Sequence, residues 1–151
     1  VSRECMPIDK KDNLFSIAIK HRYTKFFLID EAQFLTAIQV DQLAKAVDTL
    51  GVTVLCYGLR SDFKSRLFPA SKRLFEIADV LEEIKAYCRC GNRAIINARF
   101  NQEGKIVLDG EQVLVGGEET YRPICRECFN FYVEQLNKEE KIVNENNETS
   151  C

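Results

Sequence analysis

Apolar residues form two short runs in the first third of the chain, separated by an amphipathic segment. The first run covers residues 26–29 and the second covers residues 52–57. A near-continuous run like the first is typical of a strand that is buried on both faces of a parallel sheet. Between the runs, apolar residues recur every third or fourth position over residues 40–50, which predicts a helix. Thr36 suits its N-cap and Gly51 suits its end.

The order strand, helix, strand predicts a right-handed βαβ unit with parallel strands. Asp30 and Glu31 directly follow the first strand, and a loop at residues 58–69 follows the second. Ligands of open α/β sheets bind beyond the carboxyl ends of the strands, so we expect both acids and this loop on the ligand side. Further elements are predicted at residues 14–22 (helix), 71–78 (helix) and 82–87 (strand).

The pattern changes at Cys88, after which short β-like runs (residues 94–100 and 112–115) alternate with glycines. A helix is predicted at residues 126–137, and the end of the chain is polar. We therefore expect three parts: an α/β core at residues 1–87, a small β-rich subdomain at residues 88–132, and a disordered tail at residues 133–151.

Composition narrows the class of protein. Hydrophobic residues make up 46% of the 151, enough for a real core, and the formal net charge is −2. Nucleic acid and anionic membranes attract basic surfaces, so we expect neither as a partner. Apolar runs are much shorter than the roughly 18–20 residues of a membrane span. The chain starts with Val1 and shows no signal peptide, so we expect a processed, trimmed or incomplete chain.

Seven cysteines are present, and four of them form two tight clusters, C-x-C and C-x-x-C. Clustering and an odd total favour a metal site in a reducing compartment over a disulfide framework. Zinc takes four thiolates tetrahedrally, and such a closed site is structural. The alternative is unrelated buried or redox thiols. Cys56 lies in an apolar run and is expected in the core. The four clustered cysteines are Cys88, Cys90, Cys125 and Cys128.

Two interpretations of the adjacent acids Asp30 and Glu31 remain open from the residues alone. They could form a solvated turn or a helix N-cap, where carboxylates are common. They could instead be a Walker B pair, in which a buried strand delivers the first acid to a magnesium ion and the second accepts a proton.

A family resemblance rests on five motifs that occur in order: LIDEAQFL, VLCYGLRSDF, CRCG, GEQVLVGGEETY and CREC. Together they resemble the type II, zinc-containing thymidine kinases over residues 26–131, and most closely the bacterial members of the enterobacterial kind. The resemblance implies an α/β fold, a RecA-like P-loop kinase core with a parallel sheet that is incomplete at its N-terminus, and a β-rich zinc-binding lasso subdomain. It also implies transfer of the ATP γ-phosphoryl group to the 5′-hydroxyl of thymidine, in deoxynucleotide salvage for DNA synthesis.

The resemblance also implies roles for individual residues. Glu31 matches the general base, Asp30 matches the residue that holds Mg²⁺ with ATP, and Gln33 lies in the same nucleotide-contacting stretch. The four clustered cysteines match the ligands of a structural Zn²⁺. Phe68 is a further candidate for the thymidine pocket. The expected thymidine-binding residues are Phe34, Leu59, Phe63, Asn97, Gln112, Val113, Leu114, Val115, Gly116 and Tyr121, several of them through their backbone.

One family motif is missing from the 151 residues. No G-x-x-x-x-G-K-S/T stretch occurs, and the one Gly-Lys pair is Gly104-Lys105, followed by Ile106. Backbone amides and a lysine that would hold the ATP phosphates are therefore absent from this sequence. We expect either an N-terminally truncated kinase or a degenerate member, and no ATP-dependent activity from these 151 residues alone.

The expected partners are thymidine, ATP and thymidine triphosphate as feedback inhibitor, in a cytoplasmic homotetramer, all as the resemblance implies. The alternative is a zinc-ribbon binding module on a degenerate, catalytically inactive α/β domain. A helicase-type ATPase, suggested by the DEAQ string, needs a far longer chain and a basic track.

Overall fold

The computed structural model describes residues 5–112 and 120–148. The chain divides into two compact units. Unit 1 contains residues 1–60 and 67–81, and unit 2 contains residues 61–66 and 82–151. The division differs from the expected boundary after residue 87, because the short loop 61–66 packs with the second unit although the chain on both sides of it belongs to the first.

Unit 1 is built around a two-stranded parallel sheet, as predicted. Strand β1 (Phe26–Ile29) pairs with β2 (Thr53–Cys56) in the register Phe26↔Thr53 to Ile29↔Cys56. Helix α2 (Ala37–Leu50) connects them, which confirms the βαβ unit. Because the strands are parallel, both deliver their following residues to the same edge of the sheet.

Local sequence signals explain where α2 begins and ends. Thr36 accepts a hydrogen bond from the Gln39 N–H, and the Gln39 side chain accepts one from the Thr36 N–H, which completes a capping box. Gly51 ends the helix in the left-handed conformation (φ 65°). Both predicted ends of the helix are therefore confirmed.

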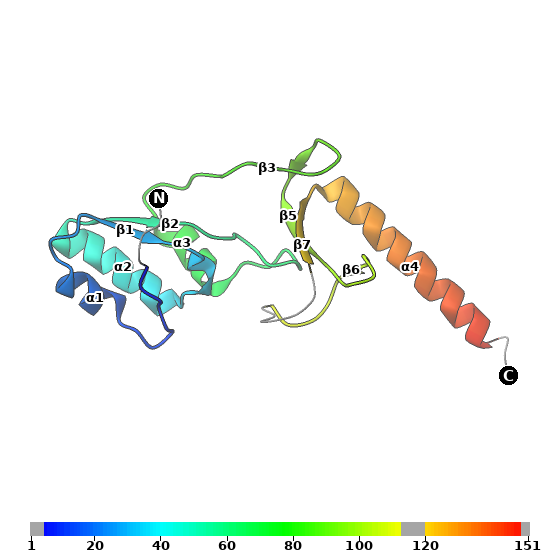
Figure 1. Cartoon of the computed structure of the whole chain (residues 1–151), viewed down its shortest axis with the longest axis horizontal. Coiled ribbons are helices and arrows are strands. Elements are labelled where there is room, and N and C mark those ends of the chain that lie inside the picture. Colours follow the sequence, from blue (N-terminus) through cyan, green and yellow to red (C-terminus); the bar gives the residue numbers. More distant parts are fainter. Residues whose placement is uncertain (1–4, 113–119, 149–151) are drawn as a thin grey trace. The chain divides into compact units, whose positions relative to one another are not determined.

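The helices of unit 1 lie on one face of the sheet. Helix α1 (Leu14–Lys20) packs beside α2 (Figure 1). Phe27 and Ile29 of β1 pack against residues of these two helices. Phe26 and Leu28 point to the other face and are 62% and 68% exposed. The prediction that this strand is buried on both faces is wrong, because a strand's side chains alternate and here the helices cover one side.

Two other predicted elements of this region differ in extent. Helix α3 (Pro69–Ile77) begins at a proline, which favours the first turn of a helix. The strand predicted at 82–87 is wrong over most of its length, because strand β3 contains Ala86–Tyr87 alone.

Unit 2 contains a hairpin and a three-stranded antiparallel sheet. Strand β3 pairs with β4 (Arg93–Ala94). Strand β5 (Ile96–Phe100) lies between β6 (Ile106–Val107) and β7 (Thr120–Ile124). The whole chain is therefore a mixed α/β protein whose one parallel pair of strands, among the described residues, is in unit 1.

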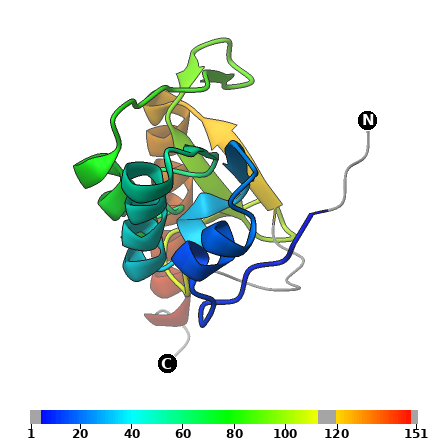
Figure 2. The same cartoon turned by 90° about the vertical axis from the view of Figure 1, so that its left-hand side faces the viewer.

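Helix α4 (Arg126–Glu148) follows β7 and packs on the antiparallel sheet (Figure 2). Its contacts with the core recur at helical spacing, through Phe129, Tyr132, Val133 and Leu136. We expected a helix that ends at residue 137 and a disordered tail from residue 133, whereas the helix continues to Glu148. In the part of the chain described, no helix has the length and apolarity that crossing a membrane requires.

Candidate active site and metal centre

Asp30 and Glu31 lie at the carboxyl end of β1, where both side chains are exposed. The Asp30 carboxylate accepts a hydrogen bond from the Glu31 N–H (2.9 Å), and Glu31 adopts the left-handed conformation (φ 52°). Glu31 is the N-cap of the short 3₁₀ helix η1 (Ala32–Phe34), but among the described residues its side chain makes no capping bond. The helix-cap interpretation of Glu31 therefore does not explain its carboxylate.

The left-handed residue turns the chain back toward the end of the second strand. The Ala32 N–H donates to the Tyr57 carbonyl (2.8 Å), and the Tyr57 N–H donates to the Ile29 carbonyl (2.8 Å). These bonds continue the pairing of β1 and β2 past their ends. They hold Glu31 beside the loop that follows β2, as the parallel order predicts.

Gln33 is buried beneath the acids, with 2% of its surface exposed. Its Nε2 donates to Glu31 Oε2 (2.5 Å), and its Oε1 accepts from the Leu59 N–H (2.9 Å). The side-chain amide is thus used between two protein groups, whereas we expected it to contact a nucleotide.

Leu59 and Phe34 are the two expected thymidine-binding residues in unit 1. The Leu59 carbonyl accepts a hydrogen bond from Ser71 Oγ (2.7 Å), so this backbone is fixed from both sides. Phe34 is 46% exposed and packs edge-on against the buried Phe68, with ring centres 6.0 Å apart. Phe68 therefore supports Phe34 from the core.

Phe63 belongs to the loop 61–66 of unit 2 and is 2% exposed. Its neighbour Asp62 is also buried and organises the loop: Oδ1 accepts from the N–H groups of Lys64 (2.9 Å) and Arg66 (2.8 Å). Asp62 Oδ2 accepts from Gln112 Nε2 (3.0 Å). Sequence reasoning missed Asp62, although an aspartate that bonds the backbone two residues on is a known turn signal.

Arg99 is the second residue that sequence reasoning missed. It lies on β5, is 1% exposed, and its Nε donates to Tyr121 Oη (2.8 Å) while Nη2 donates to the Glu111 carbonyl (2.8 Å). Its guanidinium also covers the Phe63 ring at 3.8 Å from the centre. One arginine therefore contacts three segments of unit 2, and each of them contains an expected thymidine-binding residue: Phe63, Gln112 or Tyr121.

The other expected thymidine-binding residues also belong to unit 2. Asn97, on β5, is half-buried and lies opposite Pro123 of β7. Tyr121, on β7, lies opposite Arg99 of β5. Gln112 joins this group through its bond to Asp62. Val113, Leu114, Val115 and Gly116 lie outside the described residues. The structure thus brings Phe63, Gln112 and Tyr121 together through Asp62 and Arg99.

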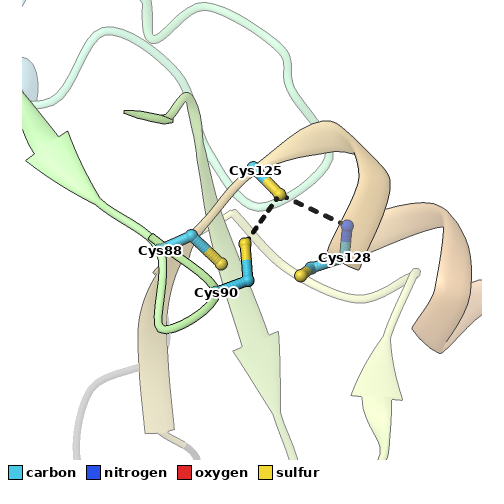
Figure 3. A group of neighbouring side chains, drawn as sticks. All are labelled: Cys88, Cys90, Cys125 and Cys128. Carbon is cyan, nitrogen blue, oxygen red and sulfur yellow. Dashed lines mark hydrogen bonds between the residues drawn. The ribbon is translucent and has the colours of Figure 1, made fainter. Parts of the chain in front are cut away.

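Four cysteine sulfurs of unit 2 point toward one another, as Figure 3 shows. Cys88 and Cys90 come from the turn between β3 and β4, where Gly91 (φ 91°) allows the sharp reversal. Cys125 directly follows β7, and Cys128 lies in the first turn of α4. All four ligand atoms lie within 4.8 Å of one another, so the group could hold a metal ion.

The spacing of the sulfurs fits zinc and excludes a disulfide. Cys90 Sγ and Cys125 Sγ are 3.6 Å apart, whereas tetrahedral zinc with bonds of about 2.3 Å puts two sulfurs about 3.8 Å apart. The six described cysteines are all free thiols.

Hydrogen bonds from the backbone of Cys90 and Cys125 lower the pKa of the Cys88 thiol to about 6. Contacts with the thiols of Cys90, Cys88 and Cys125 raise the pKa of Cys128, as expected when thiols share a small space.

The geometry therefore defines a mixed α/β protein with two exposed acids at a strand end and a cluster of four cysteines that could hold a metal ion. The thymidine kinase family matches residues 2–129. A thymidine kinase of Mannheimia succiniciproducens is 45% identical over 134 residues, which cover 87% of this chain and 68% of that protein. The thymidine kinase of Pasteurella multocida is 44% identical over 129 residues, covering 83% and 67%. That of Yersinia pseudotuberculosis is 48% identical over 115 residues, covering 75% and 59%.

The chain belongs to the thymidine kinase family, and it spans about two thirds of the length of these curated relatives. The family match and the named relatives cover most of the chain, and they support thymidine kinase function and therefore a phosphotransferase activity. The resemblance that the five motifs carry is confirmed.

Proposed function

We propose that this chain carries the catalytic base and the thymidine-binding elements of a kinase that transfers the ATP γ-phosphoryl group to the 5′-hydroxyl of thymidine. The observation that supports this most is Glu31. Its carboxylate is exposed at the carboxyl end of a parallel strand, is not used as a helix cap, and is held by a buried amide. A carboxylate that is both accessible and oriented is what a general base needs.

The two acids take different roles in this proposal. Glu31 accepts the proton of the 5′-hydroxyl as that oxygen attacks the γ-phosphorus, and the bond from the γ-phosphorus to the ATP bridging oxygen breaks. Asp30, one residue earlier at the strand end, would hold Mg²⁺ with ATP. An ion bound there would neutralise negative charge on the ATP phosphates. Oxygen ligands such as the exposed Asp30 carboxylate suit that ion.

Each unit contains residues that the proposal assigns to thymidine binding. In unit 1 these residues are Phe34 and Leu59, and in unit 2 they are Phe63, Asn97 and Tyr121. Gln112 and the backbone of residues 113–116 would contact the thymine edge. Recognition by fixed donors and acceptors rejects bases that leave those groups unpaired.

We assign structural zinc to Cys88, Cys90, Cys125 and Cys128, in a lasso subdomain that the zinc holds together. Four protein ligands would leave no open position on the ion, so it would stabilise unit 2 and take no part in the reaction. Unit 1 would be the part of a RecA-like kinase core that bears the acids. The 151 residues contain no phosphate-loop motif, so we expect them to be inactive alone. We place the enzyme in the cytoplasm as a homotetramer under feedback inhibition by thymidine triphosphate.

The test measures phosphoryl transfer from radiolabelled ATP to thymidine by the protein as its gene encodes it, including any residues encoded before Val1. We expect thymidine monophosphate, and a fall in kcat of about 10²–10⁴-fold for Glu31→Gln, the range for a general base. Glu134→Gln, an exposed glutamate on α4, is the matched control and should keep full activity. Thymidine-independent turnover, or an active Glu31→Gln, would contradict the proposal. Turnover by the 151 residues alone would refute their expected inactivity.

A further inference from the structure

The side chain of Gln33 connects the two functional segments of unit 1. A buried amide must have partners for both of its ends, and Gln33 finds them in Glu31 and Leu59. A backbone N–H can only donate, so the atom that faces the Leu59 N–H is the amide oxygen. The amide nitrogen then faces Glu31, which fixes the direction of both bonds.

This arrangement engages one carboxylate oxygen of Glu31 and leaves the other without a bond from Gln33. Gln33 Nε2 donates to Glu31 Oε2, so we expect Oε1 to face the 5′-hydroxyl. Glu31 has a left-handed backbone, which is uncommon for a residue other than glycine. A glutamate on a turn of this kind has several rotatable bonds, and the bond from Gln33 restricts them to one orientation.

The same amide sets the position of the loop after β2. The Leu59 N–H is held by Gln33 and its carbonyl is held by Ser71. Leu59 is one of the residues proposed to pack on thymidine. The base and a wall of the substrate site are therefore connected through a single side chain.

Gly58 provides an independent observation for the same junction. A Cβ on Gly58 would lie 2.5 Å from Gln33 Oε1 and 3.1 Å from the backbone nitrogens of Ala32 and Gln33. Side-chain carbons do not approach a polar atom so closely, so a residue with a Cβ would displace the amide. The backbone at position 58 comes this near because it has no side chain.

We propose that Gln33 is a positioning residue of the kinase reaction. Its side chain orients the Glu31 carboxylate and holds the Leu59 backbone at a fixed distance from that carboxylate. This inference rests on the proposed role of Glu31 as general base. It differs from the nucleotide contact that the family resemblance implies, because both ends of the amide are already engaged inside the protein.

The geometric part is tested on the 151-residue chain by ¹⁵N NMR. Gln33→Met removes both bonds at similar side-chain length, and it should shift the Leu59 backbone amide signal. Glu31→Gln should shift the Gln33 side-chain amide signals. The matched control is Gln42→Met, which removes the bond from the Leu14 N–H to a half-buried glutamine and should leave the Leu59 signal unchanged. A Leu59 signal that is identical in Gln33→Met would overturn the inference.

The kinetic part uses the protein as its gene encodes it. Misplacing a reacting group by about 1 Å can cost about 10²-fold, so we expect Gln33→Met to lower kcat by that order while KM for ATP stays nearly constant. Gly58→Ala should cause a similar loss of kcat with Gln33 still present. Gln42→Met should keep kcat. A rise in KM for ATP at unchanged kcat would show that Gln33 binds the nucleotide, and would overturn the inference, as would normal kcat in both variants.

The two proposals fail in different ways. If the unmodified protein does not phosphorylate thymidine, the proposed function is wrong, and the NMR result still decides whether Gln33 holds Glu31 and Leu59. If the unmodified protein is active but Gln33→Met and Gly58→Ala are equally active, the positioning role is wrong and the proposed function stands.

Discussion

The guanidinium carbon of Arg99 lies 3.8 Å from the centre of the Phe63 ring, and both side chains are almost fully buried. In this stacked position the guanidinium also donates to Tyr121 and to the Glu111 carbonyl. The flat shape of arginine allows the face to cover an aromatic ring while the edge donates hydrogen bonds. One residue therefore connects the loop 61–66 with strand β7 and with the residues that precede Gln112.

Arg99→Met should destabilise unit 2 strongly. It would remove the hydrogen bonds from a charged group to the Tyr121 hydroxyl and the Glu111 carbonyl, and bonds of this kind contribute about 1.5–3 kcal/mol each. We expect the free energy of unfolding in urea, followed by circular dichroism, to fall by about 2–3 kcal/mol. Arg99→Lys should recover little of this loss, because an ammonium group cannot stack and reach both acceptors.

Arg66→Met is the matched control for Arg99, because the Arg66 side chain is exposed in the neighbouring loop. Surface substitutions of this kind change stability by less than about 0.5 kcal/mol. Equal losses in the Arg66 and Arg99 variants would contradict the importance of the buried contacts.

Asp62→Ala should release the loop 61–66 without unfolding the protein. It removes the acceptor for the N–H groups of Lys64 and Arg66 and for the Gln112 side chain. We expect amide hydrogen exchange at Lys64 and Arg66, measured by NMR, to accelerate by about tenfold for each 1.4 kcal/mol of lost protection.

The control for Asp62 is Asp109→Ala, which breaks a 2.6 Å salt bridge between Lys64 and an aspartate whose side chain is 96% exposed. Exposed ion pairs of this kind contribute about 0–1 kcal/mol, so exchange at Arg66 should change little. If amide exchange were faster in the Asp109 variant than in the Asp62 variant, the salt bridge and not Asp62 would hold the loop 61–66 in its conformation.

Local signals in the sequence were sufficient for much of the fold. Helix α2 has a capping box at one end and glycine at the other, and these features act within a few residues of the chain. The parallel pairing of β1 and β2 follows from the intervening helix. The exposure of Phe26 and Leu28 could not be predicted, because an apolar residue looks the same whether or not a neighbouring layer covers it.

The candidate site was predictable where chemistry is concentrated in a motif. The cysteine clusters and the adjacent acids are recognisable from spacing alone, and the structure brings the four sulfurs together. Arg99 was not recognisable, because strand alternation puts it on the face opposite Ala98 and Phe100, and the loops that bury it come from distant parts of the chain. The two protein partners of Gln33 were not predictable, because the motif does not reveal which groups a buried amide will bond.

Cys125→Ser should remove the metal and destabilise unit 2. A structural zinc site requires all four ligands, and its binding energy contributes to folding. We expect about one zinc per chain in the unmodified protein by elemental mass spectrometry, and little in the variant. Cys5→Ser, at an exposed cysteine outside the cluster, should keep the metal. Equal zinc content in both variants would contradict the assignment of the site.

Cys56 should react slowly with alkylating agents at neutral pH because burial raises the pKa of its thiol to about 11. The thiolate is the reactive form, and at pH 8 a thiol with that pKa is about 0.1% ionised, against about 20% for an ordinary cysteine. The range from pH 8 to pH 10 lies below this pKa, so the thiolate fraction rises about tenfold with each pH unit. The rate of modification should therefore rise about tenfold per pH unit.

Peptide mass spectrometry after timed iodoacetamide treatment measures each cysteine separately. We expect the exposed Cys5 to be modified first at pH 8, and Cys56 only after prolonged exposure or in urea, where burial is lost. Because Cys56 packs with Leu14 and Ile29 against the helices of unit 1, its protection also reports whether that unit is folded. Rapid modification of Cys56 at pH 8, at a rate that does not increase with pH, would mean that β2 is open to solvent on the side that the helices are expected to cover.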